Sequence, residues 1–185
     1  MNPTNTISIA RSLRLHWHLY VFEAVELASF MLSACAFSVL LFDPSPRTLH
    51  VLPSAAVRQM LFGVIMGAIA ILIILSPIGK RSGAHFNPAC TLTYLRLGKI
   101  ARTDATFYVI SQFIGGILGV GLAALIFTKS IALPTVDYAV SVPGTDGTAV
   151  AFLAELFMGS YLWAQCFGRQ ITPGSQGQPP TWSDF

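Results

Sequence analysis

The chain has 185 residues, of which 54% are hydrophobic and only 10% are charged, and its mean hydropathy is +0.64. Soluble domains carry about 25% charged residues, and disordered chains combine low hydrophobicity with high charge, so both classes are excluded for most of the chain. The formal net charge of +3 is too small to indicate nucleic acid as a partner.

Four apolar runs are long enough to cross a bilayer, for which about 20 residues are needed. They are residues 20–42, 60–78, 107–127 and 149–167. The charged residues of the first run are Glu23 and Glu26, and the fourth contains only Glu155. Because backbone amides cannot stay unpaired in hydrocarbon, we expect each run to form a helix. The sequence therefore predicts an all-α membrane protein with four spans.

The basic residues are unevenly distributed among the connecting segments. The larger group comprises Arg11, Arg14, Lys80, Arg81, Arg96, Lys99, Arg102 and Arg169, and the smaller comprises Arg47, Arg58 and Lys129. Members of the larger group lie before the first run, between the second and third runs, and after the fourth run. Since Lys and Arg accumulate on the cytoplasmic side, we expect a cytoplasmic N-terminus, with residues 43–59 and 129–148 outside the plasma or inner membrane.

The connection after the second run contains a short helix pattern. Lys80-Arg81 is followed by SGAHFNPACTLTYLRLG, in which a mostly apolar helix pattern covers residues 88–97 and ends at Gly98. At 1.5 Å per residue this helix is about 15 Å long, half of a hydrocarbon core of about 30 Å. We therefore expect a re-entrant half-helix segment at residues 83–98. Its non-helical backbone must be covered by protein or line a water-filled cavity.

Asn87 and Pro88 are typical of a helix start. Proline is favoured in the first turn because its missing N–H would have no partner there, and the asparagine oxygen can accept from that turn while the amide NH2 donates elsewhere. The helix N-terminus adds partial positive charge. This combination would orient a passing water by its oxygen and disfavour a cation. Taken alone, Asn-Pro-Ala is also consistent with an ordinary helix start.

The string SGAHFNPACT at residues 82–91 resembles the first signature loop of the aquaporin (major intrinsic protein) family. The similarity covers residues 19–165 and includes YVISQFIGG in the third run and VDYAVSVPG in the outer loop. It implies an aquaporin-like helix bundle in which residues 1–18 form a cytoplasmic segment and residues 19–128 a complete first repeat. It also implies passive transport of water or small neutral solutes by a homotetramer in lipid, with no enzymatic activity, cofactor or metal.

The resemblance implies roles for individual residues of the signature loop. In Asn87-Pro88-Ala89, the asparagine would donate to the permeating solute, and His85 would steady the backbone before it. A ladder of carbonyl acceptors along the pore would come from Gly83, Ala84, His85 and Phe86. In the second run, Met66 is expected at the narrowest filter.

A buried glutamate in each repeat supports the re-entrant loop in this family. Glu155 matches that position in the fourth run, whereas Glu23 and Glu26 compete for it in the first. They are three residues apart and so share one helix face. Glu23 is favoured by its depth and small neighbours, but the choice stays open.

Small residues in the third run predict close helix packing. We expect this role for Gln112, Gly115, Gly116, Gly119 and Gly121. The three cysteines, Cys35, Cys90 and Cys166, have no metal or redox spacing and are expected to pack as small apolar residues.

The second repeat departs from the family pattern. After the outer loop at 129–148 and the span at 149–167, residues 168–185 are rich in Gly, Pro, Gln and Ser, which predicts disorder. No second Asn-Pro-Ala and no fifth or sixth apolar run follows. We therefore expect a repeat truncated after its first span, and a lone chain that is not a selective pore.

Two alternatives remain open. The chain could be a non-conducting fragment that assembles with full-length relatives, or a half-channel that pairs with an inverted copy. The unequal distribution of basic residues argues against the second, because dual insertion needs a weak bias. The residues that decide between water and glycerol-type solutes lie largely outside this sequence.

Overall fold

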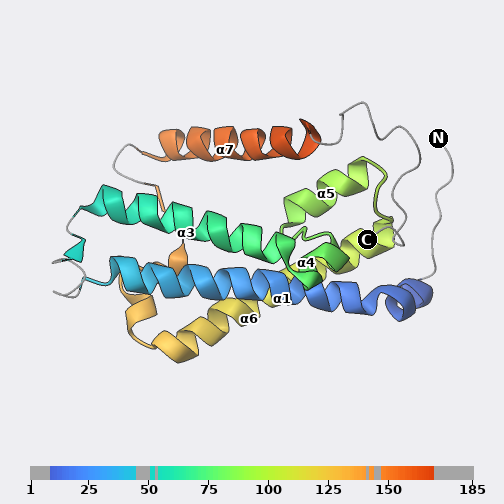
Figure 1. Cartoon of the computed structure of the whole chain (residues 1–185), viewed down its shortest axis with the longest axis horizontal. Coiled ribbons are helices and arrows are strands. Elements are labelled where there is room, and N and C mark those ends of the chain that lie inside the picture. Colours follow the sequence, from blue (N-terminus) through green and yellow to red (C-terminus); the bar gives the residue numbers. More distant parts are fainter. Residues whose placement is uncertain (1–8, 45–50, 53, 141, 144–146, 169–185) are drawn as a thin grey trace. The chain divides into compact units, whose positions relative to one another are not determined.

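The computed structural model describes residues 9–44, 51–52, 54–140, 142–143 and 147–168, and its regular structure there is helical (Figure 1). The chain divides into two compact units after Ala139. The first unit contains α1 (Ile9–Phe42), α3 (Ala55–Leu75), α4 (Pro77–Ser82), α5 (Pro88–Arg96), α6 (Arg102–Phe127) and the short 3-10 helices η1 (Ser130–Ala132) and η2 (Asp137–Ala139). The second contains α7 (Thr148–Gly168). The predicted all-α fold is confirmed.

Three helices, α1, α3 and α6, are long and apolar enough to cross a membrane. They correspond to the first three predicted runs. α7 covers the fourth, and residues Thr148–Phe157 form its shorter described apolar stretch. Two sets of predictions fall outside the described residues. One is the tail at 168–185, of which only Gly168 is described, and the other is the basic residues Arg47 and Arg169.

The second predicted run is wrong at its C-terminal end. α3 stops at Leu75 instead of reaching residue 78, because Ser76 has an extended backbone (φ −64°, ψ 157°) and Pro77 starts a separate helix. Proline restricts the preceding residue to extended conformations. Ser76 Oγ accepts a hydrogen bond from the Gly79 N–H at 2.9 Å and so caps α4.

A polar cluster explains why α1 begins at Ile9, well before the predicted start at residue 20. Asp104 in the first turn of α6 accepts through Oδ1 from the hydroxyl of Ser12 and from that of Tyr20 at 2.6 Å. His16 Nδ1 lies 3.1 Å from the same oxygen. These contacts bind the first turns of α1 to α6.

α1 and α6 form the most extensive helix contact in the first unit and lie side by side (Figure 1). A Cβ atom on Gly115 or Gly119 would collide with the backbone carbonyl of Ala24 or Ala28. Gly116 has only the Leu27 side chain nearby, at 3.7 Å, and Gly121 faces open space. The close backbone approach therefore lies at Gly115 and Gly119.

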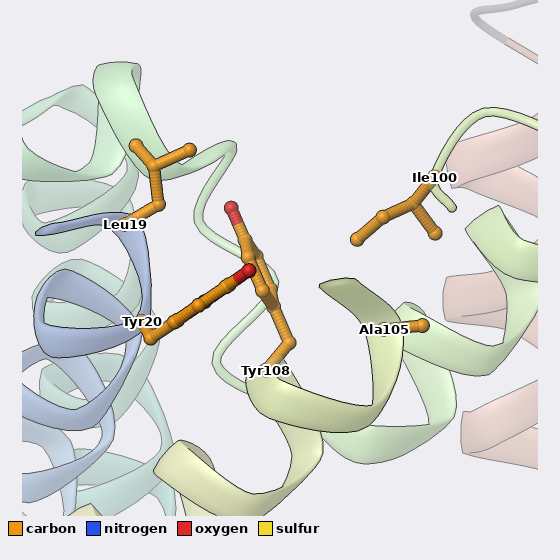
Figure 2. Close-up of a cluster of buried hydrophobic side chains, with 5 residues drawn as sticks. All are labelled: Leu19, Tyr20, Ile100, Ala105 and Tyr108. Atoms are coloured by element: carbon orange, nitrogen blue, oxygen red, sulfur yellow. The ribbon is translucent and has the colours of Figure 1, made fainter. Parts of the chain in front are cut away.

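Two buried apolar clusters mark the ends of this contact. The first joins the start of α1 to the start of α6 and contains Leu19, Tyr20, Ile100, Ala105 and Tyr108, as Figure 2 shows. The second joins the later parts of α1 and α6 to η1 and contains Cys35, Ala123, Ile131 and Val136. Because each helix starts at the first cluster and runs to the second, α1 and α6 are parallel.

Candidate functional site

Residues 83–87 form a non-helical connection between α4 and α5. α4 ends at Gly83, whose φ of +90° is left-handed. Ala84 and Phe86 also have positive φ values, +47° and +22°, which are uncommon for residues with a side chain. Such backbone persists where its surroundings over-determine it, and it concentrates at functional sites. This backbone therefore requires neighbouring groups that hold it in place.

Glu23 of α1 holds the connection in place. Its side chain is fully buried. Oε1 accepts from the His85 N–H at 2.9 Å, and Oε2 accepts from the Phe86 N–H at 2.8 Å. Gln112 of α6 donates through Nε2 to Oε2 at 2.7 Å. Of the two competing glutamates, Glu23 is thus the one that bonds to the backbone of the connection.

Thr91 of α5 links this carboxylate cluster to His85. Gln112 Nε2 also donates to Thr91 Oγ1 at 3.0 Å, and that hydroxyl donates to the Asn87 carbonyl at 3.3 Å. His85 Nδ1 lies 3.1 Å from Thr91 Oγ1. Because the hydroxyl hydrogen is directed to Asn87, we assign the proton to Nδ1. The His85 side chain is buried.

The start of α5 has the geometry that its sequence predicts. Asn87 is the N-cap, with an extended backbone, and its Oδ1 accepts from the Ala89 N–H at 2.8 Å. Pro88 occupies the first turn, and the helix ends at Arg96. Gly98 follows with a φ of +69°. The predicted cap and the predicted stop are confirmed.

Several polar groups on this connection have no hydrogen-bond partner among the described residues. Within the described residues, the carbonyls of Gly83, Ala84, His85 and Phe86 accept no hydrogen bond, and Asn87 Nδ2 donates none. Four acceptors and one donor therefore follow one another along the chain. At membrane depth, such groups are tolerated only where protein or a water-filled cavity satisfies them.

Contacts along α1 show the course of the connection. Ser82 Oγ donates to Glu26 Oε1 at 2.6 Å, and the Phe86 ring lies 5.6 Å from that of Phe30, further along α1. After α5, Ile100 packs in the cluster at the start of α1 and α6 (Figure 2). The chain thus passes toward the middle of α1 and comes back toward its beginning.

An apolar groove of about 710 Å³ lies between α1 and α6 beside the start of α5. Its lining includes Leu27, Met31, Pro88, Gln112, Gly116 and Val120. Gln112 Oε1 is buried and has no hydrogen-bond partner within the described residues. This end of the groove therefore combines apolar walls with one acceptor that lacks a donor.

The other predicted site residues belong to helices α3 and α7. Met66 is half-buried on α3, and Glu155 is exposed on α7 in the second unit. Gln112, which was expected at a helix contact, is fully buried on α6 and donates to Glu23 of α1 and to Thr91 of α5. In the described part of the chain, no group of three or more His, Cys, Asp or Glu side chains could hold a metal ion.

Three residues of the cluster were not singled out from the sequence. Ser82 Oγ bonds to Glu26, the Tyr108 hydroxyl donates to the Ser82 carbonyl at 2.8 Å, and Thr91 links Gln112 to Asn87. Spacing provides a signal for two of them. Thr91 follows Asn87 by four residues, and Tyr108 precedes Gln112 by four, which places each pair on one helix face.

Comparison with known proteins gives partial matches of one kind. An aquaglyceroporin of Rhizobium meliloti, AqpS, is 45% identical over 74 residues, which are 40% of this chain and 30% of that protein. A probable NIP-type aquaporin of Nicotiana alata is 32% identical over 81 residues, 44% of this chain and 29% of the relative. Aquaporin A of Dictyostelium discoideum is 30% identical over 119 residues, 63% of this chain and 41% of the relative. No solved structure matches.

The matched segments thus span well under half the length of these relatives. The family model described as Major intrinsic protein matches residues 12–179, nearly the whole chain. Together with three helices able to cross a membrane, this match identifies a multi-pass membrane protein. The chain belongs to the major intrinsic protein family.

Proposed function

We propose that this chain supplies one half of an aquaporin-type channel through which water or small neutral solutes pass without coupling to a chemical reaction. The proposal depends on one observation: within the part of the chain that the structure describes, the connection at residues 83–87 carries four carbonyls and an Asn87 amide without hydrogen-bond partners, while Glu23 fixes the backbone that presents them. A solute with both donor and acceptor groups, such as water, can bond to each in turn.

The electrostatics of the same segment disfavour cations. Asn87 caps the N-terminus of α5, where the helix carries partial positive charge, and its amide NH2 is a donor. A solute oxygen is attracted there, whereas a cation is repelled. We propose that residues 83–98 enter the membrane from the cytoplasmic side and return to it, so that this positive end lies at mid-membrane. The larger group of basic residues would then lie in the cytoplasm.

The 185-residue chain by itself is proposed not to be a selective pore. These 185 residues contain one Asn-Pro-Ala, and among the described residues it gives one helix end of this kind, that of α5. The groove beside Pro88 and Gln112 is open to whatever surrounds the first unit. Assembly with a full-length relative, or a homotetramer in the plasma or inner membrane as the family resemblance implies, would cover such surfaces.

Proteoliposomes test both parts of the proposal. In one arm, residues 12–139 replace the corresponding first half of the Rhizobium meliloti aquaglyceroporin, and light scattering records water and glycerol uptake. We expect the chimera to conduct and its Asn87→Asp variant to lose most of that conduction. A chimera that inserts and folds without conducting would contradict the channel assignment. In the other arm, the 185-residue chain alone should leave permeability at the level of empty liposomes, and a rise would refute its incompetence.

A further inference from the structure

Glu26 is a second buried carboxylate in the cluster that holds the connection, and the arrangement above gives it no role. It is 3% exposed, and Glu23, one turn away on α1, is fully buried. A spacing of three residues places the two on one face of α1. Burying a charge is expensive unless it is paired and hydrogen-bonded. The question is therefore how a buried cluster accommodates two carboxyl groups.

Hydrogen-bond donors are distributed unequally between the two. Glu23 accepts from two backbone N–H groups and from Gln112 Nε2. Glu26 accepts from the Ser82 hydroxyl only, through Oε1. Within the described residues, Glu26 Oε2 and Gln112 Oε1 are both buried without a partner, and both are acceptors in this arrangement. The cluster thus has more acceptors than donors.

Within the described residues, no cationic side chain bonds to either carboxyl group. The ion pair found within the described residues, His16–Asp104, lies in the separate cluster at the start of α1. The titratable groups around Glu26 are Glu23 on its own helix, Tyr108 from α6 and His85 from the connection. Lys80 and Arg81 of α4 are exposed. Two carboxyl groups that share a buried site without a cation do not both ionise.

We propose that Glu26 is a proton-binding site: it stays protonated at neutral pH while Glu23 carries the charge. Three donors stabilise the ionised form of Glu23, whereas the proton on Glu26 supplies the cluster with the donor that it lacks. Glu26 then bonds to Ser82 without adding a second charge. Because Ser82 Oγ also accepts from the Ala84 N–H at 3.0 Å, proton loss at Glu26 would disturb the start of the connection. This inference does not depend on whether the chain conducts.

Infrared spectroscopy of the full chain in lipid tests the proposal directly. A protonated carboxylic acid has a carbonyl stretch separate from the carboxylate and amide bands. We expect this band in the wild type at neutral pH, its loss in Glu26→Gln, and its retention in Glu155→Gln, the matched control in the second unit. Absence of the band from the wild type, or its persistence in Glu26→Gln, would overturn the proposal.

Stability provides a second readout. Since the folded chain holds a proton that the unfolded chain releases, the unfolding midpoint of the wild type should fall as pH rises from neutral to alkaline. Glu26→Gln keeps a neutral, hydrogen-bonding side chain and needs no proton to fold, so it should be at least as stable as the wild type at neutral pH and should lose this dependence. A Glu26→Gln chain that cannot fold would overturn the proposal. So would a wild type that sodium stabilises and that shows no acid band, because the site would then bind a cation.

Discussion

Two regions of the first unit differ in the side chains that they bury. One is the contact between α1 and α6, and the other is the helix α3. Between α1 and α6, glycines allow the backbones to touch, and Glu23, Thr91 and Gln112 are fully buried. α3 has no buried residue, and both Gly63 and Gly67 face open space. One region satisfies polar groups inside the protein, and the other presents apolar side chains outward.

This difference follows from the solvent that a membrane protein meets. Hydrocarbon solvates an apolar helix, so exposure of α3 carries no penalty, whereas each unpaired backbone group in lipid costs several kcal/mol. Several buried polar side chains, those of Glu23, Thr91 and Gln112 among them, therefore surround the non-helical backbone at residues 83–87. Substitutions should be severe near that connection and mild on α3. The expected loss of stability decreases from substitutions at Glu23 through Gly115 and Asn87 to Leu72.

Replacing Glu23 with alanine should destabilise the chain most. The His85 and Phe86 amides and Gln112 Nε2 would lose their shared acceptor, and three lost hydrogen bonds at about 1 kcal/mol each give about 3 kcal/mol. Denaturant-induced unfolding in detergent measures the change. A Glu23→Ala chain within 1 kcal/mol of the wild type, on the order of a single hydrogen bond, would show that the connection is held by other groups.

Leucine at Gly115 should be nearly as harmful. Its Cβ collides with the Ala24 carbonyl, so α1 and α6 must separate, and overpacking of this kind costs about 1–3 kcal/mol. Gly121→Leu is the matched control, because Gly121 lies on the same helix and faces open space. Equal unfolding midpoints for the two variants would refute the close contact.

Asn87→Ala should cost about 1 kcal/mol, the usual value of a lost N-cap. The Ala89 N–H loses its acceptor, and the first turn of α5 frays. Hydrogen exchange of that turn should accelerate in this variant, while exchange in α6 stays unchanged. Uniform acceleration in both helices would mean that Asn87 stabilises more than the start of α5.

Leu72→Ala on α3 should have the smallest effect. Leu72 is 68% exposed, and substitutions away from packed or polar features usually change stability by less than about 0.5 kcal/mol. The same unfolding assay measures it. A loss comparable to that of Gly115→Leu would indicate that α3 packs against protein, and the contrast between the two regions would fail.

Sequence patterns predicted the helices that hydropathy and capping control. The apolar runs gave α1, α3 and α6, and the Asn87 cap and the Gly98 stop gave α5 to within a residue. The break at Ser76 was missed because the run stays apolar across Pro77. The early start of α1 was missed because it depends on Asp104, far along the chain, and not on local hydropathy.

The candidate site was less accessible to sequence reasoning. Motif residues such as Asn87 carry a local signal, but the choice between Glu23 and Glu26 depends on which carboxyl group faces the connection, and one helix face contains both. Contacts of Thr91 and Tyr108 arise from packing between segments. Among the described residues, Glu26 Oε2 and Gln112 Oε1 are buried without a hydrogen-bond partner. This also follows from three-dimensional placement, which no spacing rule predicts.

The most direct test of the account is which side of the membrane the ends of residues 83–98 occupy. After Cys35, Cys90 and Cys166 are replaced by serine, single cysteines at Lys80, Asn87 and Lys99 are treated with a membrane-impermeant thiol reagent from each side in turn. We expect the cysteines at Lys80 and Lys99 to react from the same side and the one at Asn87 to react far more slowly. Reaction of the Lys80 and Lys99 cysteines from opposite sides would mean that the segment crosses the membrane, and the account of its polar loop would be wrong.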